Sequence, residues 1–272
     1  MTKHRQAKNA TLQYSRSMRL RAIILGILAL LLVTLAVVIT KDTVSAPATN
    51  SSQTAEHSQS TSPAFDKTRF STTDPSSIWV IVNKQHMINP KTYTPASLVV
   101  PNIPLRSNIT GDEKQVSNIM APALEQMAAA AAKDGITLNL QSGYRSYNFQ
   151  VNLYNSYVKN DGQAQADQES ARPGYSEHQT GLAADLGGVT DPSCNVQQCF
   201  ASTPEGKWLA AHAYEYGFII RYTTAKQSIT GYEDEPWHVR YIGTDLSTKM
   251  HKDGVTTLEE FFGVSGGEAY TN

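Results

Sequence analysis

Cysteine is scarce in this sequence. The 272 residues contain only two, Cys194 and Cys199. Two thiols separated by only four residues make a poor zinc site. In an oxidising compartment the pair can close a short loop through a disulfide, and in a reducing one both thiols stay free. The sequence leaves both alternatives open.

Positive charge is also in short supply over most of the chain. Residues 42–272 carry 16 Lys and Arg against 24 Asp and Glu, a net charge of −8. Proteins that bind nucleic acid need a basic surface to neutralise phosphates, and no basic stripe is visible here. We therefore expect no nucleic acid among the partners. The sequence shows no internal repeat either.

A long hydrophobic run, by contrast, is present near the N-terminus. Residues 1–21 contain six Lys and Arg and no acidic residue, and the 18 residues 22–39 that follow are largely apolar. A membrane-spanning helix needs about 20 apolar residues, with about 17 as the lower end. We expect a transmembrane helix over residues 22–40 and, because basic flanks stay inside, a cytoplasmic tail over 1–21.

The competing interpretation of this segment is a cleaved signal peptide. Residues 46–48, Ala-Pro-Ala, have the small-x-small form that a signal peptidase accepts. The apolar region of a signal peptide is usually about 7–15 residues long, which favours an uncleaved anchor. Under either interpretation the remainder of the chain lies outside the cytoplasm. The expected location is the cell membrane, with one span and an extracellular domain.

The rest of the chain divides into a tether and one domain. Residues 41–77 are rich in Ser and Thr and show no apolar periodicity, so we expect a flexible tether there. Residues 78–272 form the predicted domain. Periodicity and capping residues predict helices at 122–133, 146–159 and 204–216, and strands at 78–82, 136–140, 182–186, 218–222 and 237–242. Thr203 before the last of these helices and Gly217 after it are the expected caps. The mixed order of these helices and strands predicts an α+β fold.

Two segments carry the residue types of metal chemistry. Residues 176–185 contain His178 and Asp185, and residues 233–241 contain His238, with Glu235 three positions earlier. A catalytic zinc needs about three protein ligands and one open position, and imidazole and carboxylate ligands suit it. A strand at 182–186 beside one at 237–242 would bring these residues together. Glu235 would then be close enough to act as a general base, with Glu233 and Asp234 as competing candidates.

The motifs resemble those of the VanY-like D-alanyl-D-alanine carboxypeptidases, a branch of the LAS zinc metallopeptidases. The signature S-x-H-x-x-G-x-A-x-D matches residues 176–185, E-x-W-H-x-x-Y matches 235–241, and Ser-Gly-Tyr-Arg-Ser matches 142–146. The resemblance extends over about residues 105–263. Three motifs in the same order are far more specific than any one of them.

The resemblance implies a role for each matched residue. His178, Asp185 and His238 would bind Zn²⁺, and Glu235 would be the catalytic base. Arg145 would stabilise the oxyanion that develops on the scissile carbonyl, and Ser176 would contact the substrate. The implied fold is a small antiparallel sheet with packed helices and the zinc site on the sheet. The implied function is removal of the terminal D-Ala from peptidoglycan stem pentapeptides, and we expect a monomer.

Several alternatives stay open. One is an L,D-carboxypeptidase that trims tetrapeptide stems, and another is a cell-wall binding module without catalysis. Arg221 could meet a substrate carboxylate or form a structural ion pair. Five further histidines are interpreted as non-ligands because they lie outside the motifs, namely His4, His57, His86, His212 and His251.

Overall fold

The computed structural model describes residues 64–271. A four-stranded antiparallel sheet in the order β3-β4-β6-β5 lies at the centre of this part of the chain. These strands are β3 (Asn139–Ser142), β4 (Ala183–Gly187), β5 (Phe218–Tyr222) and β6 (Glu235–Tyr241). A two-stranded sheet joins β1 (Leu98–Val99) to β2 (Val116–Ser117). The predicted α+β class and small antiparallel sheet are confirmed.

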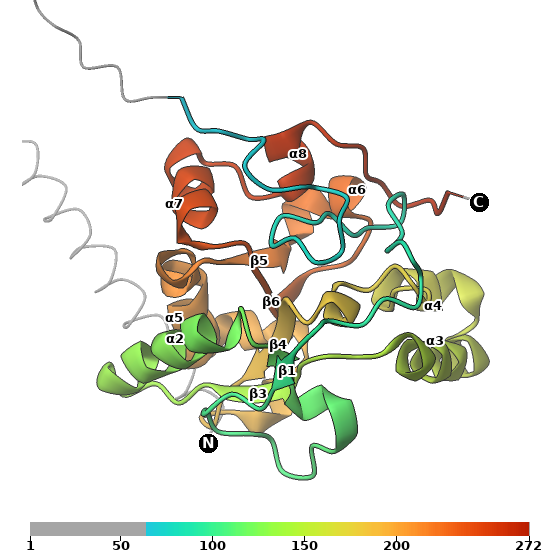
Figure 1. The fold of residues 1–272 in the computed structure, drawn as a ribbon. Coiled ribbons are helices and arrows are strands. Elements are labelled where there is room, and N and C mark those ends of the chain that lie inside the picture. Colours follow the sequence, from blue (N-terminus) through green and yellow to red (C-terminus); the bar gives the residue numbers. More distant parts are fainter. Residues whose placement is uncertain (1–63, 272) are drawn as a thin grey trace, which may run out of the picture. The chain divides into compact units, whose positions relative to one another are not determined.

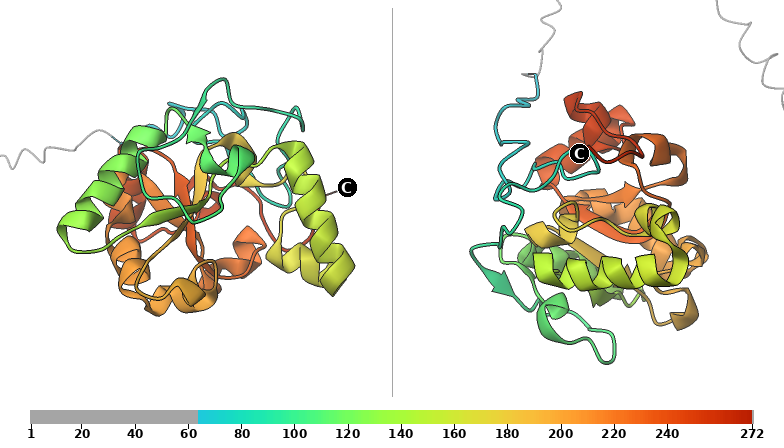
Figure 2. Two further views of the ribbon diagram at one scale, coloured as in Figure 1. Left: turned by 90° about the horizontal axis from the view of Figure 1, so that it is seen from below. Right: turned by 90° about the vertical axis from the view of Figure 1, so that its right-hand side faces the viewer.

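Helices surround the sheet on several sides (Figure 1). The α-helices are α2 (Ala121–Lys133), α3 (Tyr147–Asp161), α4 (Gln163–Glu169), α5 (Pro204–His212), α6 (Gln227–Thr230), α7 (Thr244–Asp253) and α8 (Leu258–Phe262). Short 3₁₀ helices connect them: η1 (Gly111–Lys114), η2 (Glu177–Thr180), η3 (Pro192–Cys194), η4 (Gln198–Ser202), η5 (Ala213–Tyr216) and η6 (Thr224–Lys226). Figure 1 and the left-hand view of Figure 2 show α2 and α3 on opposite sides of the sheet.

The two faces of the sheet differ because side chains alternate along each strand. Ala184 and Leu186 of β4 and Val239 of β6 belong to the main hydrophobic core, which also contains residues of α2 and α5. Asp185 and His238 therefore point to the other face. This alternation places the polar residues of the two motifs on one face of the sheet, opposite the core.

A second hydrophobic cluster lies beside α7 and α8. Trp79 and Ile81 pack there with residues of β5, α7 and α8, and all of these side chains are buried. Residues before position 78 contribute as well, since Phe65 stacks on Trp79 at a centroid distance of 5.7 Å and Phe70 meets the same ring edge-on at 4.9 Å. Contacts with the domain thus begin in a stretch that the sequence assigned to the tether, because its two phenylalanines pack on the buried Trp79.

The strand predicted at residues 78–82 is wrong. This apolar segment is buried but pairs with no strand of the sheet. Its carbonyl groups bind a side chain instead: Arg240 Nη2 donates to the carbonyls of Ile78 and Val80 at 3.1 and 2.8 Å. Trp79 Nε1 donates to the carbonyl of Ile242 at 3.0 Å. Since these bonds satisfy backbone groups that a ladder would otherwise use, the segment stays irregular.

The other elements follow the predictions with small shifts. The strand expected at 136–140 is observed at Asn139–Ser142, and the helix expected at 204–216 is α5 followed by the 3₁₀ turn η5. Thr203 caps α5 by accepting a hydrogen bond from the amide of Gly206, and Gly217 ends the turn with a φ of 88°. The predicted capping residues are therefore confirmed at both ends.

The predicted tail at 1–21, the transmembrane helix at 22–40 and most of the tether lie outside the described residues. Within residues 64–271, no helix has the length and apolar character needed to cross a bilayer. Cys194 and Cys199 are joined by a disulfide, which is the first of the two alternatives that the sequence left open.

Candidate metal centre

Two of the predicted ligands come from adjacent strands. In the antiparallel ladder of β4 and β6, Asp185 lies directly opposite His238. Side chains of directly opposed residues on one face are close neighbours, so the ladder register alone brings these two together. The interpretation of His238 as a residue of the neighbouring strand is confirmed.

His178 reaches the same point from the 3₁₀ turn η2, before β4. The turn ends at Gly181, whose φ of 68° favours glycine and where a Cβ would lie 3.1 Å from the amide nitrogen of Ser117. The imidazole is oriented by Gly143, whose carbonyl accepts from His178 Nδ1 at 2.7 Å. A Cβ on Gly143 would lie 2.1 Å from the carbonyl oxygen of Gln115, so this position also requires glycine.

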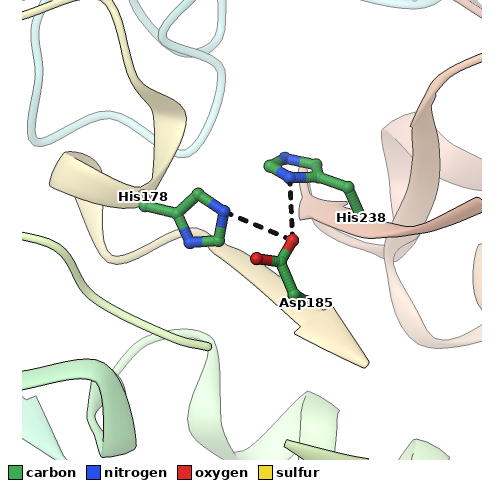
Figure 3. Close-up of side chains that lie close together, drawn as sticks. All are labelled: His178, Asp185 and His238. Atoms are coloured by element: carbon green, nitrogen blue, oxygen red, sulfur yellow. Dashed lines mark ion pairs between the residues drawn. The ribbon is translucent and has the colours of Figure 1, made fainter. Parts of the chain in front are cut away.

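The three side chains converge on one point (Figure 3). His178 Nε2 lies 3.4 Å and His238 Nδ1 lies 3.2 Å from the same oxygen, Asp185 Oδ1. The three potential ligand atoms all lie within 4.8 Å of one another, and all three residues are buried. Among the described residues, this is the one group of His, Cys, Asp and Glu side chains with such geometry.

The hydrogen bonding of this cluster fits a bound cation. His178 Nε2 and Asp185 Oδ1 are buried and have no hydrogen-bond partner. Buried polar atoms are otherwise almost always paired, so orphaned atoms that face one another indicate a missing ligand. Each histidine has its other ring nitrogen occupied, His178 by the carbonyl of Gly143 and His238 by Glu177 Oε2 at 3.2 Å. Two imidazoles and one carboxylate are a donor set of catalytic zinc.

The protonation states are compatible with metal binding. Burial and the neighbouring guanidinium of Arg145 lower the pKa of His178 to about 4, so this imidazole is neutral. Burial opposes ionisation of Asp185, but the two histidines and Arg145 hold its pKa well below the ordinary value. Burial would also lower the pKa of His238, yet the neighbouring carboxylates of Asp185 and Glu177 raise it to about 9. Metal binding at His238 Nδ1 would therefore displace a proton.

Glu235 lies next to the ligands at the start of β6. Its Oε2 is 3.5 Å from His238 Nδ1, and its side chain is 19% exposed. Burial, together with the neighbouring Asp185, raises the pKa of Glu235 to about 7 against the opposing effect of His238. A carboxyl group with a pKa near 7 can both accept and donate a proton at neutral pH. The competing candidate base, Asp234, accepts a hydrogen bond at Oδ1 from the amide of Thr224 at 3.0 Å.

Arg145 and Ser176 border the same space. Arg145 Nη2 lies 3.3 Å from Asp185 Oδ2, and its buried Nε atom has no hydrogen-bond partner. Arg145 Nη1 is 3.5 Å from Oε1 of the buried Gln150, whose amide nitrogen donates to the carbonyl of Ala171 at 2.8 Å. Ser176 precedes η2 at its N-cap position, makes no side-chain capping hydrogen bond there, and lines the same cleft. All six residues named from the motifs are thus brought together.

These residues line an open cleft of about 540 Å³. Helix α3 forms part of one wall, and Val196, Gln197 and Gln198 of the disulfide-closed loop form part of another. Among the described residues that line the cleft, Arg145 is the one arginine or lysine, and the acidic residues there include Glu233 and Asp234. The cleft is large enough for a short peptide segment.

The structure decides the open question about Arg221. Its side chain is fully buried and bonded to two carboxylates: Nε donates to Glu177 at 2.8 Å, and Nη2 donates to Glu259 at 2.7 Å. It is therefore a structural ion pair and does not reach the cleft. Glu177 itself was missed by the sequence analysis. It occupies a variable position of the first motif, and nothing in its sequence context distinguishes it from a surface glutamate.

The histidines expected to be non-ligands lie apart from the cluster where the structure describes them. His86 contacts Ser265, His212 contacts Glu215, and His251 stacks on Tyr214. His4 and His57 lie outside the described residues.

Comparison with known proteins gives a consistent picture. Residues 113–244 match the family described as "VanY: D-alanyl-D-alanine carboxypeptidase". The chain is 41% identical over 189 residues to the "Putative carboxypeptidase YodJ" of Bacillus subtilis (strain 168), covering 70% of this chain and 68% of that protein.

Two solved structures share the fold. The LdcB LD-carboxypeptidase is 39% identical, with a TM-score of 0.65 over 71% of this chain and 89% of the other. A mutant of the vancomycin-resistance D,D-pentapeptidase VanY, in complex with Zn(II), is 30% identical, with a TM-score of 0.54 over 67% of this chain and 97% of the other.

The fold, the cluster and these matches define a zinc-dependent peptidase class. The chain belongs to the VanY family of D-alanyl-D-alanine carboxypeptidases. It is a carboxypeptidase that acts on peptidoglycan, and His178, Asp185 and His238 form its candidate zinc site.

Proposed function

We propose that this protein is a zinc-dependent D,D-carboxypeptidase that removes the terminal D-Ala from peptidoglycan stem pentapeptides. The observation that carries the proposal is the buried cluster of His178, Asp185 and His238, in which two unpaired ligand atoms face one another beside Glu235. A binding module without catalysis would need neither the ligand set nor a carboxyl group with a pKa near 7 next to it.

The proposed mechanism assigns a separate task to each residue. Zinc held by the three ligands supplies Lewis acidity, which polarises the scissile carbonyl and makes water acidic near neutral pH. Glu235 accepts the proton of the attacking water and delivers it to the leaving amine, so the carboxyl group is regenerated in each cycle.

The oxyanion that forms on the carbonyl requires a positive partner. Arg145 is the guanidinium in the cleft, and its unpaired Nε leaves donor capacity for this charge. Its present partners, Asp185 and Gln150, lie 3.3 and 3.5 Å away, so the guanidinium is held at the edge of the metal centre. Ser176 is proposed to contact the substrate backbone through its hydroxyl.

A second candidate is an L,D-carboxypeptidase that trims tetrapeptide stems. It is favoured by the LdcB LD-carboxypeptidase, which is more similar to this chain in both identity and TM-score than the VanY D,D-pentapeptidase. The two activities cleave different bonds but use the same ligands, base and arginine. The difference must therefore lie in how the cleft positions the stem peptide.

Mass spectrometry of stem peptides separates the two candidates. The full-length protein in detergent, supplied with zinc, is incubated in parallel with a pentapeptide and a tetrapeptide stem. Loss of one alanine from the pentapeptide with an intact tetrapeptide supports the D,D activity, and the reverse supports the L,D activity. If neither peptide is shortened while zinc is bound, the carboxypeptidase proposal fails.

We also propose that residues 22–40 anchor the protein in the cell membrane, with the catalytic domain outside the cell. The support is the 18-residue apolar run with its basic flank. N-terminal sequencing of protein extracted from membranes tests this, and a mature protein that begins near Thr49 would show that the segment is removed.

A single chain supplies every proposed site residue, which supports a monomer, and light scattering tests that expectation.

A further inference from the structure

The imidazole of His238 has two sides with different surroundings. Its Nδ1 lies 3.2 Å from Asp185 Oδ1 and faces the candidate zinc site. Its Nε2 faces away from that point and lies 3.2 Å from Oε2 of Glu177. Both residues are buried, and Glu177 is 1% exposed. Glu177 is thus the hydrogen-bond partner on the side of His238 opposite the metal.

Two arginines hold the carboxylate of Glu177 in place. Its Oε1 accepts from Arg221 Nε and from Arg240 Nη1, each at 2.8 Å. Both guanidinium groups are fully buried, and water does not screen these contacts. With two cations bonded to one of its oxygens, Glu177 is stable only as the carboxylate, because a neutral acid would leave both cations uncompensated.

A carboxylate can only accept hydrogen bonds. The ring nitrogen that faces Glu177 must therefore carry the hydrogen, which makes His238 Nε2 the protonated atom. A neutral imidazole with hydrogen on Nε2 presents its lone pair at Nδ1, the atom that faces Asp185. Partners that bind the second nitrogen of a ligand histidine fix its tautomer and increase its basicity.

The carboxylate is anchored far from the motif in sequence. Arg221 also donates through Nη1 and Nη2 to both oxygens of Glu259, at 3.0 and 2.7 Å, and Asn83 Nδ2 binds Glu259 Oε1 at 2.8 Å. Arg240 donates through Nη2 to the carbonyls of Ile78 and Val80. Two arginines and two glutamates thus form a neutral buried network that joins His238 to α8 and to the segment before β1.

We propose that Glu177 is a positioning residue of the metal centre, which sets the tautomer of His238 so that Nδ1 binds zinc. It touches neither the metal nor the substrate, and it acts through the histidine. This inference rests on the proposed zinc site and adds a residue to it. Its consequence is that the zinc affinity of the protein depends on a glutamate outside the ligand set.

The test compares two isosteric substitutions within the network. Glu177→Gln replaces the carboxylate with an amide: the two arginines take the amide oxygen, so its NH₂ group, which can only donate, faces His238 Nε2. Glu259→Gln changes the other carboxylate bound to Arg221 without contacting His238. Zinc affinity is measured on the full-length protein in detergent by competition with a chelator. We expect Glu177→Gln to weaken zinc binding by about 10–100-fold and Glu259→Gln to stay near the wild-type value. Equal affinities of wild type and Glu177→Gln, or an equal loss in both variants, would overturn the proposal.

A spectroscopic measurement on the wild type keeps the inference testable if Glu177→Gln does not fold. In the zinc-loaded protein, ¹⁵N NMR of the His238 ring should show hydrogen on Nε2 and metal at Nδ1. Hydrogen on Nδ1 would contradict the assignment whatever the variants do. Failure of the wild type to bind zinc would instead refute the proposed function, so the two failures are distinguishable.

Discussion

Buried polar atoms on the two sides of His238 differ in whether they have hydrogen-bond partners. On the cleft side, His178 Nε2, Asp185 Oδ1 and Arg145 Nε are buried without partners. On the far side, every donor nitrogen of Arg221 and Arg240 has an acceptor, and both oxygens of Glu177 and Glu259 accept bonds. The unpaired atoms on the cleft side lie where a bound ligand can satisfy them. The paired side holds His238 in position beside the other ligands.

The largest effect is expected when the cleft side loses a ligand. His238→Ala leaves two of the three ligands, so zinc binding and hydrolysis should both be lost, and chelation of the wild type should have the same result. His212→Ala is the matched control, because His212 lies in the described part of the chain with a partly exposed side chain bonded to Glu215. Zinc content is measured beside the hydrolysis rate for each protein. Hydrolysis by a metal-free preparation would contradict the assignment as a metallopeptidase.

Glu235 should separate chemistry from metal binding. Glu235→Gln leaves His178, Asp185 and His238 untouched, so zinc should be retained. The rate should fall by at least about 10²–10⁴-fold, the usual contribution of positioned acid–base catalysis. Glu233→Gln, two positions earlier, serves as the control and should keep most of the activity. If Glu235→Gln lost zinc as readily as His238→Ala, Glu235 would have to be reassigned as a ligand and the base sought at Glu233 or Asp234.

Substitutions in the buried ion-pair network behind His238 should lower the free energy of unfolding. Arg221→Met removes the cation shared by Glu177 and Glu259, and leaving buried charges uncompensated costs about 3–5 kcal/mol. Arg69→Met breaks the exposed pair with Asp245, in which the side chains are 57% and 67% exposed. Exposed pairs contribute about 0–1 kcal/mol. Denaturant unfolding of both variants measures the contrast, and similar losses would mean that the buried network is not what holds this side together.

The smallest effect is expected at the wall of the cleft. The disulfide closes a loop with a sequence separation of 5, for which the chain-entropy estimate is about 2 kcal/mol. The double variant Cys194→Ser, Cys199→Ser should lose that stability and keep its zinc. Because Val196 and Gln197 line the cleft, KM should rise more than kcat falls. Loss of zinc from this variant would show that the loop supports the metal centre as well.

The sequence predicted the residues of the candidate metal centre far better than the buried ion-pair network behind His238. His178, Asp185, His238 and Glu235 were found because the residue types of zinc chemistry recur there at fixed spacing within recognisable motifs. Strands at 182–186 and 237–242 were expected to be neighbours, and in the observed register Asp185 lies opposite His238. Helix ends at Thr203 and Gly217 were predictable for a similar reason, because capping is a local interaction.

Glu177 and the segment 78–82 show where such reasoning stops. The apolar, β-branched run at 78–82 has the composition of a strand, but its carbonyls are taken by Arg240, 160 residues or more away in sequence. Glu177 acquires its role from Arg221, Arg240 and His238, which are 44 to 63 positions distant. No local sequence pattern predicts which arginine will form an ion pair with a given glutamate.

The amino-acid sequence by itself determined the ligand types, their spacing, the alternation that puts Asp185 and His238 on one face, and the family. Tertiary structure alone decided which nitrogen of each histidine faces the candidate metal site, that Arg221 is buried in an ion pair, and that Phe65 and Phe70 pack on Trp79. The physical reason is range. Periodicity, capping and motif spacing act over a few residues, whereas a buried charge is stable only beside a partner that the fold brings from elsewhere in the chain.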